Sequence, residues 1–324
     1  MDHVKVAVIQ ASAVAFDPDA TIDKIDTLVA EAAANGVKLA VFPEAFVSAY
    51  PKWLDFGCRV GMRRPEGRED FRRYWESSID VPGPHTRRIG DIAKKHDMYI
   101  VVGVMERESR TLYCTVLYFS PTGELVGKHR KLMPTASERL IWGFGDGSTL
   151  ATMDTPYGRV GGVICWENYM PLLRTAMYAK GVSIYCTPTA DDRPTWLPSM
   201  QHIALEGRCF VLSSCQVMRR KDFPEQYDTG TQVEPDTVMM RGGSCIIGPL
   251  GEVLAGPVWD EEAIVYADLD LGDIARASLD FDAVGHYSRP DIFKLLVNQT
   301  PHTPVVFENR AADFQEHCSE EDDQ

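Results

Sequence analysis

The segment "GGVICWENYM", residues 161–170, decides how the rest of the chain is interpreted. An apolar run from Val160 to Ile164 is typical of a buried strand, and it ends abruptly at Cys165. A helical pattern begins near Met170, so the thiol lies at a strand-to-helix corner. Backbone N–H groups face the same space at such a corner and can lower the pKa of a thiol. Cys165 is therefore either a nucleophile or a small buried filler, since cysteine packs well in apolar cores.

Short β-branched runs recur on both sides of this segment and alternate with helical patterns. Strands are predicted over 4–10, 39–44, 99–106, 113–120, 161–166, 182–188, 209–215, 244–249 and 263–269, and helices over 20–36, 83–97, 170–181 and 195–208. Pro-x-Gly turns predict hairpins over 118–131 and 246–257. This alternation, without a low-complexity linker, indicates one mixed α/β domain over residues 1–307. Residues 51–82 and 219–243 are the least regular stretches, and they are either pocket loops or plain surface insertions.

The charge of the chain excludes some functions. The 324 residues carry a formal net charge of −14, of which residues 308–324 contribute −6. Such a balance argues against binding nucleic acid or an anionic membrane, and the acidic tail is expected to be disordered. The sequence shows no signal-peptide pattern and no apolar run of about 18 residues, so we expect a cytoplasmic protein. Its eight cysteines lack metal-ligand spacing and are expected to be reduced.

Two further segments place chemically useful side chains at strand ends. Glu44 follows a strand in "VFPEAF", and Lys131 follows a hairpin strand in "GKHRKLMPTASER", seven residues before Glu138. Taken singly, Glu44 fits a capping acid and Lys131 fits a solvated basic edge. Together with Cys165 they supply a proton acceptor, a cation and a nucleophile. A Cys–His dyad through His129 or His202 is less favoured, and no phosphate-loop, zinc or dinucleotide motif indicates a cofactor or a metal.

The segments "VFPEAF", "GKHRKLMPT" and "ICWENYMP", in this order, resemble the Glu-Lys-Cys triad of the nitrilase superfamily. The segments "IWGFGDGST", "LRTAMYAKG", "SMQHIALEGRCFVLS" and "FDAVGHYSRPD" are similar to its plant-type branch of true nitrilases, which also has bacterial members. The resemblance implies an α/β fold, a four-layer αββα sandwich of two mixed sheets with helices outside. It implies Cys165 as nucleophile, Glu44 as general base, Lys131 as stabiliser of charge and Glu138 as a second active-site glutamate. It also implies homodimers formed through a helix-lined face, which extend into larger spirals.

The implied reaction turns a nitrile and two waters into a carboxylic acid and ammonia, with some amide as a by-product. Candidate substrate-binding residues adjoin the triad in sequence: Tyr50, Trp53, Trp166, Tyr169, Thr189, Asp191 and Trp196. Their aromatic character suits an arylaliphatic nitrile or a small amino-acid nitrile such as β-cyanoalanine, although such residues also serve as packing. An amidase or carbamoylase with the same triad is the alternative. A non-catalytic scaffold is disfavoured by the intact Glu44, Lys131 and Cys165.

Overall fold

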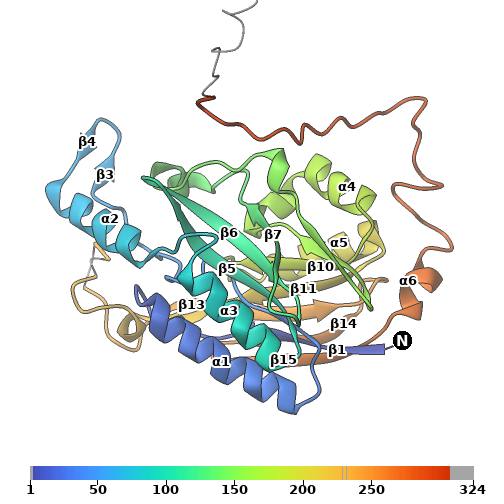
Figure 1. Cartoon of the computed structure of the whole chain (residues 1–324), viewed down its shortest axis with the longest axis horizontal. Helices are drawn as coiled ribbons and strands as arrows, with labels where there is room; N and C mark the ends of the chain where they lie inside the picture. Colours follow the sequence, from blue (N-terminus) through green and yellow to red (C-terminus); the bar gives the residue numbers. More distant parts are fainter. Residues whose placement is uncertain (1–2, 228, 231, 307–324) are drawn as a thin grey trace, which may run out of the picture.

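Apolar residues occupy both faces of the central strands, so each of two β-sheets is covered on both sides. The computed structural model describes residues 3–227, 229–230 and 232–306. The first sheet contains, in spatial order, β15 (Ala263–Asp270), β1 (His3–Gln10), β2 (Leu39–Val41), β5 (Tyr99–Glu108), β6 (Thr111–Phe119) and β7 (Leu125–Arg130) (Figure 1). Strands β1, β2 and β5 run parallel to one another, whereas β15, β6 and β7 pair antiparallel with their neighbours. The sheet is therefore mixed.

The second sheet is also mixed. Its order is β12 (Val217–Arg219), β13 (Val238–Ile247), β11 (Phe210–Cys215), β10 (Val182–Thr189), β9 (Gly158–Gly162) and β8 (Thr152–Thr155), and β14 (Val253–Trp259) also pairs with β13. Strands β9, β10 and β11 are parallel. The hairpins expected over 118–131 and 246–257 are present as the pairs β6–β7 and β13–β14.

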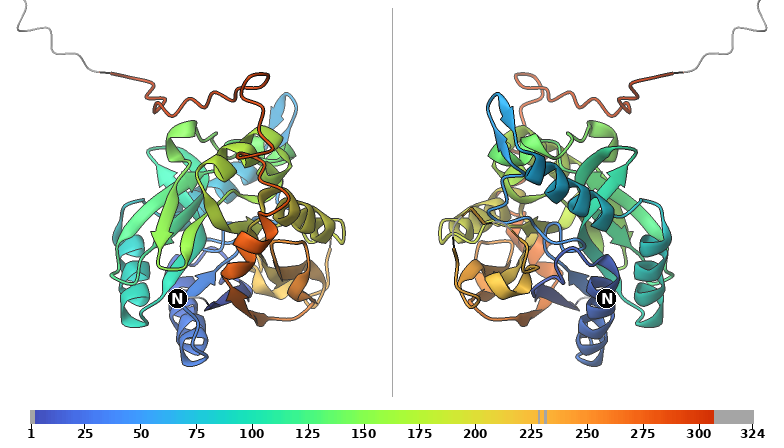
Figure 2. Two further views of the ribbon diagram at one scale, coloured as in Figure 1. Left: turned by 90° about the vertical axis from the view of Figure 1, so that its right-hand side faces the viewer. Right: turned by 90° about the vertical axis from the view of Figure 1, so that its left-hand side faces the viewer.

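Alternation along the strands separates three layers of apolar packing. On β1, Val6 and Val8 face the second sheet, whereas Ala7 and Ile9 lie under the helices. The helices α1 (Pro18–Ala34) and α3 (Pro84–Lys95) cover the outer face of the first sheet, and α4 (Pro171–Ala179) and α5 (Trp196–Gly207) cover that of the second (Figures 1 and 2). The expected αββα sandwich is confirmed.

Several elements differ from the sequence-based expectation. The stretch 51–82 holds the hairpin β3 (Cys58–Arg59) and β4 (Met62–Arg63) and the helix α2 (Pro65–Ser77). The stretch 219–243 holds a short 3₁₀ helix (Arg220–Asp222) and the beginning of β13. Charged residues occupy most of these elements, so the apolar periodicity that reveals a helix or strand is weak there.

The chain beyond the sandwich is extended. After α6 (Gly272–Ala277), residues 279–306 form no helix or strand and run over the body of the molecule (Figures 1 and 2). The acidic tail, residues 308–324, lies outside the described residues. Among the helices of the described part of the chain, none has the length and apolarity required to cross a bilayer.

Candidate active site

Cys165 lies at a sharp turn between the two sheets. Strand β9 ends at Gly162, four residues before the end of the strand expected over 161–166, and Cys165 begins a 3₁₀ helix (Cys165–Tyr169). Its φ of +53° is in the left-handed region, which a residue with a Cβ seldom adopts. Gly162 permits the turn, because a Cβ there would lie 1.9 Å from the carbonyl oxygen of Cys186 on β10. The geometry matches the strained corner that presents a nucleophile in other hydrolases.

Glu44 is fixed by close backbone packing against β5. A Cβ at Gly103 would lie 2.8 Å from the Cα of Glu44, so only glycine allows the segment to approach. The Gln216 side chain donates a hydrogen bond to the Glu44 carbonyl at 2.8 Å. The carboxylate itself is fully buried, and its Oε1 accepts from Lys131 Nζ at 2.6 Å and from Cys114 Sγ at 3.5 Å. Its Oε2 has no hydrogen-bond partner among the described residues and is free to accept a proton.

Lys131 bridges two carboxylates in the interior. Besides Glu44, its Nζ donates to Glu138 Oε2 at 2.8 Å. Glu138 also accepts from the backbone N–H of Thr135 at 2.6 Å and from the hydroxyl of Tyr50 at 2.7 Å. The Lys131 ammonium lies 5.4 Å from the centre of the Trp142 ring, within the range of a cation–π contact. The structure thus brings Glu44, Lys131 and Glu138 into one hydrogen-bonded cluster.

Burial and mutual charge set the protonation of the cluster. Burial raises the pKa of Glu44, and the charge of Glu138 adds to this effect while Lys131 opposes it. Burial alone would lower the pKa of Lys131, but the charges of Glu44, Cys165 and Glu138 outweigh it and hold that pKa well above the usual value. Burial and the Glu44 charge raise the pKa of Cys165. Burial thus shifts the pKa of this thiol in the direction opposite to the one expected for the corner, and it favours the protonated thiol over the thiolate.

Side chains at the end of β10 and in the loop after it complete the surroundings of the sulfur. The Thr189 hydroxyl donates to Cys165 Sγ at 3.2 Å and accepts from the backbone N–H of Asp191 at 2.9 Å. The Asp191 carboxylate accepts from Trp166 Nε1 at 2.9 Å and forms an ion pair with Arg193. The Arg193 guanidinium lies 4.8 Å from the centre of the Trp166 ring. Asp191 thus braces Trp166 rather than presenting a free carboxylate.

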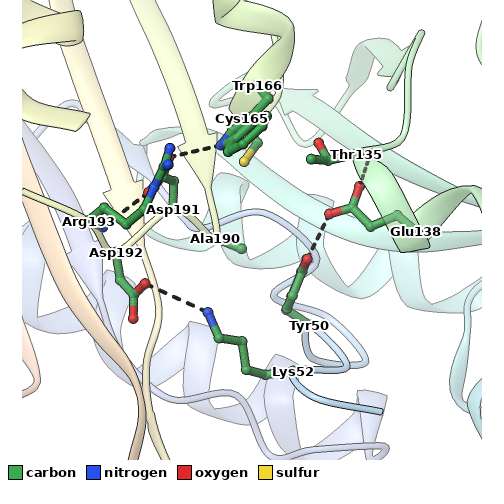
Figure 3. A pocket seen from close by; sticks show the side chains of 10 residues that line it. All are labelled: Tyr50, Lys52, Thr135, Glu138, Cys165, Trp166, Ala190, Asp191, Asp192 and Arg193. Carbon is green, nitrogen blue, oxygen red and sulfur yellow. Dashed lines mark hydrogen bonds and ion pairs between the residues drawn. The ribbon is translucent and has the colours of Figure 1, made fainter. Parts of the chain in front are cut away.

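A cleft of about 190 Å³ opens onto the thiol (Figure 3). The sulfur points into the space between Ala190, Tyr50 and Glu138, and an ion pair between Lys52 Nζ and Asp192 Oδ1, 3.7 Å apart, lies farther from it. A second cavity of about 420 Å³ shares Tyr50, Lys52 and Glu138 and continues to the half-exposed Trp53. The cleft offers a ligand mostly polar and charged side chains, and the adjoining cavity adds apolar ones such as Leu54 and Ile141.

The predicted pocket residues divide into three groups. Tyr50, Trp166 and Asp191 line the cleft, Thr189 bonds the sulfur from behind it, and Trp53 lines the adjoining cavity. Tyr169 packs edge-on between the rings of Trp166 and Trp196 and does not line either hollow. Trp196 does not reach the cleft. Its ring is buried in the layer beneath α4 and α5, where Nε1 donates to Ser213 Oγ at 2.8 Å, so it serves as packing.

Sequence reasoning missed Lys52, Asp192, Arg193 and Glu167. The first three adjoin residues already singled out, and the signal was their position in the same loops. Glu167 is buried and bonded to His129 at 3.0 Å, so His129 contacts this carboxylate and not the thiol. His202 is exposed on α5. Within residues 3–227, 229–230 and 232–306, no three His, Cys, Asp or Glu side chains are placed to share a metal ion, and we assign no residue to one.

Comparison with known proteins places the chain in a family. The model of the carbon–nitrogen hydrolase family matches residues 5–278. The chain is similar to an aliphatic nitrilase of Sinorhizobium fredii, with 57% identity over 94% of this chain and 99% of the relative. It is 56% identical to the bifunctional nitrilase/nitrile hydratase NIT4A of Lupinus angustifolius and 53% identical to nitrilase 2 of Arabidopsis thaliana, in each case over 94% of this chain and over 88% and 91% of the relative.

Solved structures agree on the fold. Yeast Nit3, a member of branch 10 of the nitrilase superfamily, superposes with a TM-score of 0.66 at 24% identity, over 85% of this chain and 93% of that one. A carbon–nitrogen hydrolase of Helicobacter pylori gives 0.68 at 19% identity, over 85% and 92%. From the family match and these close relatives, the chain belongs to the carbon–nitrogen hydrolase family and, within it, to the nitrilases.

Proposed function

We propose that this nitrilase hydrolyses its substrate through a covalent bond to Cys165, with Glu44 as general base, Lys131 as stabiliser of charge and Glu138 as the residue that holds Lys131. The observation that carries this proposal is the convergence of four side chains from distant segments. A thiol and the Glu138 carboxylate line one cleft, and the buried Lys131 ammonium lies between Glu138 and Glu44, whose second oxygen has no partner among the described residues. A nucleophile beside a general base is the arrangement that covalent catalysis requires.

The proposed steps begin with the Cys165 thiol beside the Glu44 carboxylate. Glu44 takes the proton of the Cys165 thiol as sulfur attacks the nitrile carbon, and the same proton passes to the nitrogen to give a thioimidate. Water then adds to the carbon, the C–N bond breaks and ammonia leaves, so a thioester remains. A second water releases the carboxylic acid and restores the thiol. Removing one fixed donor from such a charged step typically costs about 3 kcal/mol of barrier, and Lys131 and the backbone N–H of Trp166 are the proposed donors.

The tetrahedral intermediate can also break its C–S bond, which releases an amide. The relatives named as bifunctional nitrilase/nitrile hydratase support such a by-product here. An amidase or carbamoylase activity of the same cluster is the alternative function. Ammonia released from a nitrile, with little released from the matching amide, separates the two.

Two classes of nitrile fit different parts of the site. An amino-acid nitrile such as β-cyanoalanine carries a carboxylate and an ammonium, which Lys52 and Asp192 complement. An arylaliphatic nitrile would place its ring in the adjoining cavity near Trp53 and Leu54. Ammonia release across a panel of both classes identifies the substrate.

The test of the covalent role combines kinetics with mass spectrometry. Cys165→Ser is expected to retain less than about 1% of the activity, because a hydroxyl beside a carboxylate base is a far weaker nucleophile than a thiol. The wild-type protein, quenched during turnover, is expected to carry an acyl or imidoyl adduct on the peptide that contains Cys165. Retention of more than a few per cent of activity by a purified Cys165→Ser variant would refute the assignment.

We also propose that the chain forms homodimers that extend into larger spirals, as a single domain over residues 1–307 with an acidic tail. Large apolar side chains stand exposed on the extended segment 279–306: Leu279, Ile292, Phe293, Leu296 and Val306. Leu172 on α4 and Leu205 on α5 are also exposed, on the helical face. Apolar surface of this extent is typical of contacts between subunits. Leu296→Asp is expected to reduce the assembled mass in analytical ultracentrifugation, whereas an unchanged distribution would argue against this interface.

We place the protein in the cytoplasm. The cysteines of the described part of the chain are all free thiols, which supports a reducing compartment.

A further inference from the structure

Glu167 links the two segments that carry the proposed nucleophile and cation. Its Oε1 accepts from the backbone N–H of Leu132 at 2.6 Å, and its Oε2 accepts from the backbone N–H of Ile164 at 2.8 Å. Leu132 follows Lys131 directly, and Ile164 precedes Cys165 directly. One carboxylate thus holds the backbone at the residue next to Lys131 and at the residue next to Cys165.

The link crosses between the two sheets. Lys131 follows β7, which is the last strand of the first sheet, and Cys165 follows β9 of the second sheet. No ladder of backbone hydrogen bonds joins these strands, because β7 pairs with β6 and β9 pairs with β8 and β10. The spacing between Lys131 and Cys165 therefore depends on side chains, and in the described part of the chain Glu167 bonds both segments.

His129 holds Glu167 from behind. Its Nδ1 faces the carbonyl oxygen of Thr149 at 3.2 Å and its Nε2 faces Glu167 Oε2 at 3.0 Å, and both side chains of the pair are fully buried. A carbonyl oxygen only accepts, so Nδ1 donates to Thr149, and a hydrogen bond joins Nε2 to the Glu167 carboxylate.

We infer that Glu167, held by His129, is a positioning residue that sets the distance between the Lys131 ammonium and the Cys165 sulfur. This inference rests on the proposed roles of Lys131 and Cys165. Neither member of the pair hydrogen-bonds to a triad side chain, so the effect acts through the backbone. Displacement of a catalytic group by about 1 Å costs roughly a hundredfold in rate, whereas the affinity for the substrate depends on other residues.

The first test replaces the carboxylate with an amide of the same shape. In Glu167→Gln the side-chain NH₂ faces at least one of the donors that Glu167 accepts from, so one link is lost. We expect kcat to fall about a hundredfold with KM within about threefold of wild type. Alkylation of Cys165 by iodoacetamide, followed by peptide mapping, is expected to slow in parallel.

Glu106→Gln is the matched control. Glu106 is also a buried carboxylate bonded to residues of β7, namely Lys128 and Arg130, but it does not contact the Cys165 segment. Its replacement is expected to lower the midpoint of urea unfolding while kcat stays within about threefold of wild type. A purely structural role for Glu167 would give the same pattern as this control.

The second test uses His129. His129→Gln can still donate from its amide to Glu167, whereas His129→Leu cannot. If the ring acts by holding Glu167, His129→Gln retains several times the kcat of His129→Leu. Equal kcat for these two variants, or wild-type kcat in folded Glu167→Gln, would overturn the inference.

Unfolding of all three variants while Glu106→Gln remains folded would also overturn it, because the pair would then act on stability alone. Failure of the proposed function looks different. In that case wild-type protein releases no ammonia from any nitrile, or Cys165→Ser remains active, whatever the result at Glu167.

Discussion

Strand β7 supplies cations to two buried clusters that behave in opposite ways. Because side chains alternate along a strand, Lys128 and Arg130 lie on one face and bond Glu106, whereas Lys131 follows on the other side and bonds Glu44 and Glu138. The Glu106 cluster has two cations for one buried carboxylate, and its Arg130 also pairs with the exposed Glu108. The Lys131 cluster has one cation for two carboxylates and lies beside the Cys165 thiol.

The charge ratio and the access to water explain the difference. Burial by itself raises the pKa of Glu106, but hydrogen bonds from Arg130 and Lys128 outweigh it, so its pKa falls below the usual value. The cations of that cluster are partly exposed and keep contact with water. The Lys131 ammonium is wholly buried, and burial raises the pKa of Glu44. The first cluster stabilises the fold, and the second holds the carboxylate that we propose as the general base.

The largest effect is expected from removing the cation of the second cluster. Lys131→Ala leaves two buried carboxylates without a counter-charge and removes the proposed donor to the developing negative charge. We expect kcat to fall about a thousandfold. Lys128→Ala, in the strand β7 that precedes Lys131, is expected to keep kcat within about threefold of wild type. A Lys131→Ala variant with normal kcat and a raised KM would show that the ammonium binds substrate and does not act on the transition state.

Stability is expected to depend more on the Glu106 cluster than on the Lys131 cluster, which is the reverse of the order expected for activity. Glu106→Gln leaves Lys128 without its carboxylate and Arg130 with only the exposed Glu108, at a cost of about 2 kcal/mol in the free energy of unfolding near pH 7. Glu44→Gln is expected to change it by less than about 1 kcal/mol, since Lys131 keeps Glu138 as a partner, although activity is lost. Because the folded pKa of Glu106 is lowered, its contribution is present above the unfolded pKa and is lost as pH falls through the folded pKa. Urea unfolding at fixed protein concentration measures both variants, and a larger loss for Glu44→Gln would contradict this ordering.

The sequence predicted the placement of Glu44, Lys131 and Cys165 better than that of the residues around them. Each of Glu44, Lys131 and Cys165 stands directly after a strand-like run, and strand ends of two packed sheets meet at one edge, so their convergence could be expected. The basic run "KHRK" gave a misleading signal, because only the alternation of the strand separates the outward Lys128 from the inward Lys131. Trp196 could not be assigned from sequence, since cleft and core differ only in the direction of its ring.

A third pair of charges, at the mouth of the cleft, is expected to have a smaller effect. Lys52 and Asp192 are both partly exposed, so their interaction with each other is weak and either can turn to a ligand. Lys52→Met is expected to raise KM for an amino-acid nitrile about tenfold, which corresponds to one charged hydrogen bond, with kcat within about twofold. KM for phenylacetonitrile, which has no carboxylate, is expected to be unchanged. An equal rise for both substrates would mean that Lys52 shapes the cleft and does not recognise charge.

The smallest expected effect is a shift in the pH dependence of kcat/KM when the Lys131 cluster loses one of its two carboxylates. The base must be ionised to take the thiol proton, so kcat/KM falls as pH falls through the apparent pKa of the cluster, which burial and the Glu138 charge raise at Glu44. Glu138→Gln removes that second negative charge and lowers the pKa of Glu44, so the acid limb of kcat/KM is expected to move to lower pH. The limb for Glu106→Gln is expected to stay in place, because the main causes of the pKa shift at Glu44 are its burial and the groups Lys131, Glu138 and Cys165. A limb that stays fixed in Glu138→Gln would assign the ionisation to a group other than Glu44. A limb that moves to higher pH would mean that Lys131, once it is no longer held by the Glu138 carboxylate, has moved away from Glu44. The pKa of Glu44 would then rise, because Lys131 lowers it.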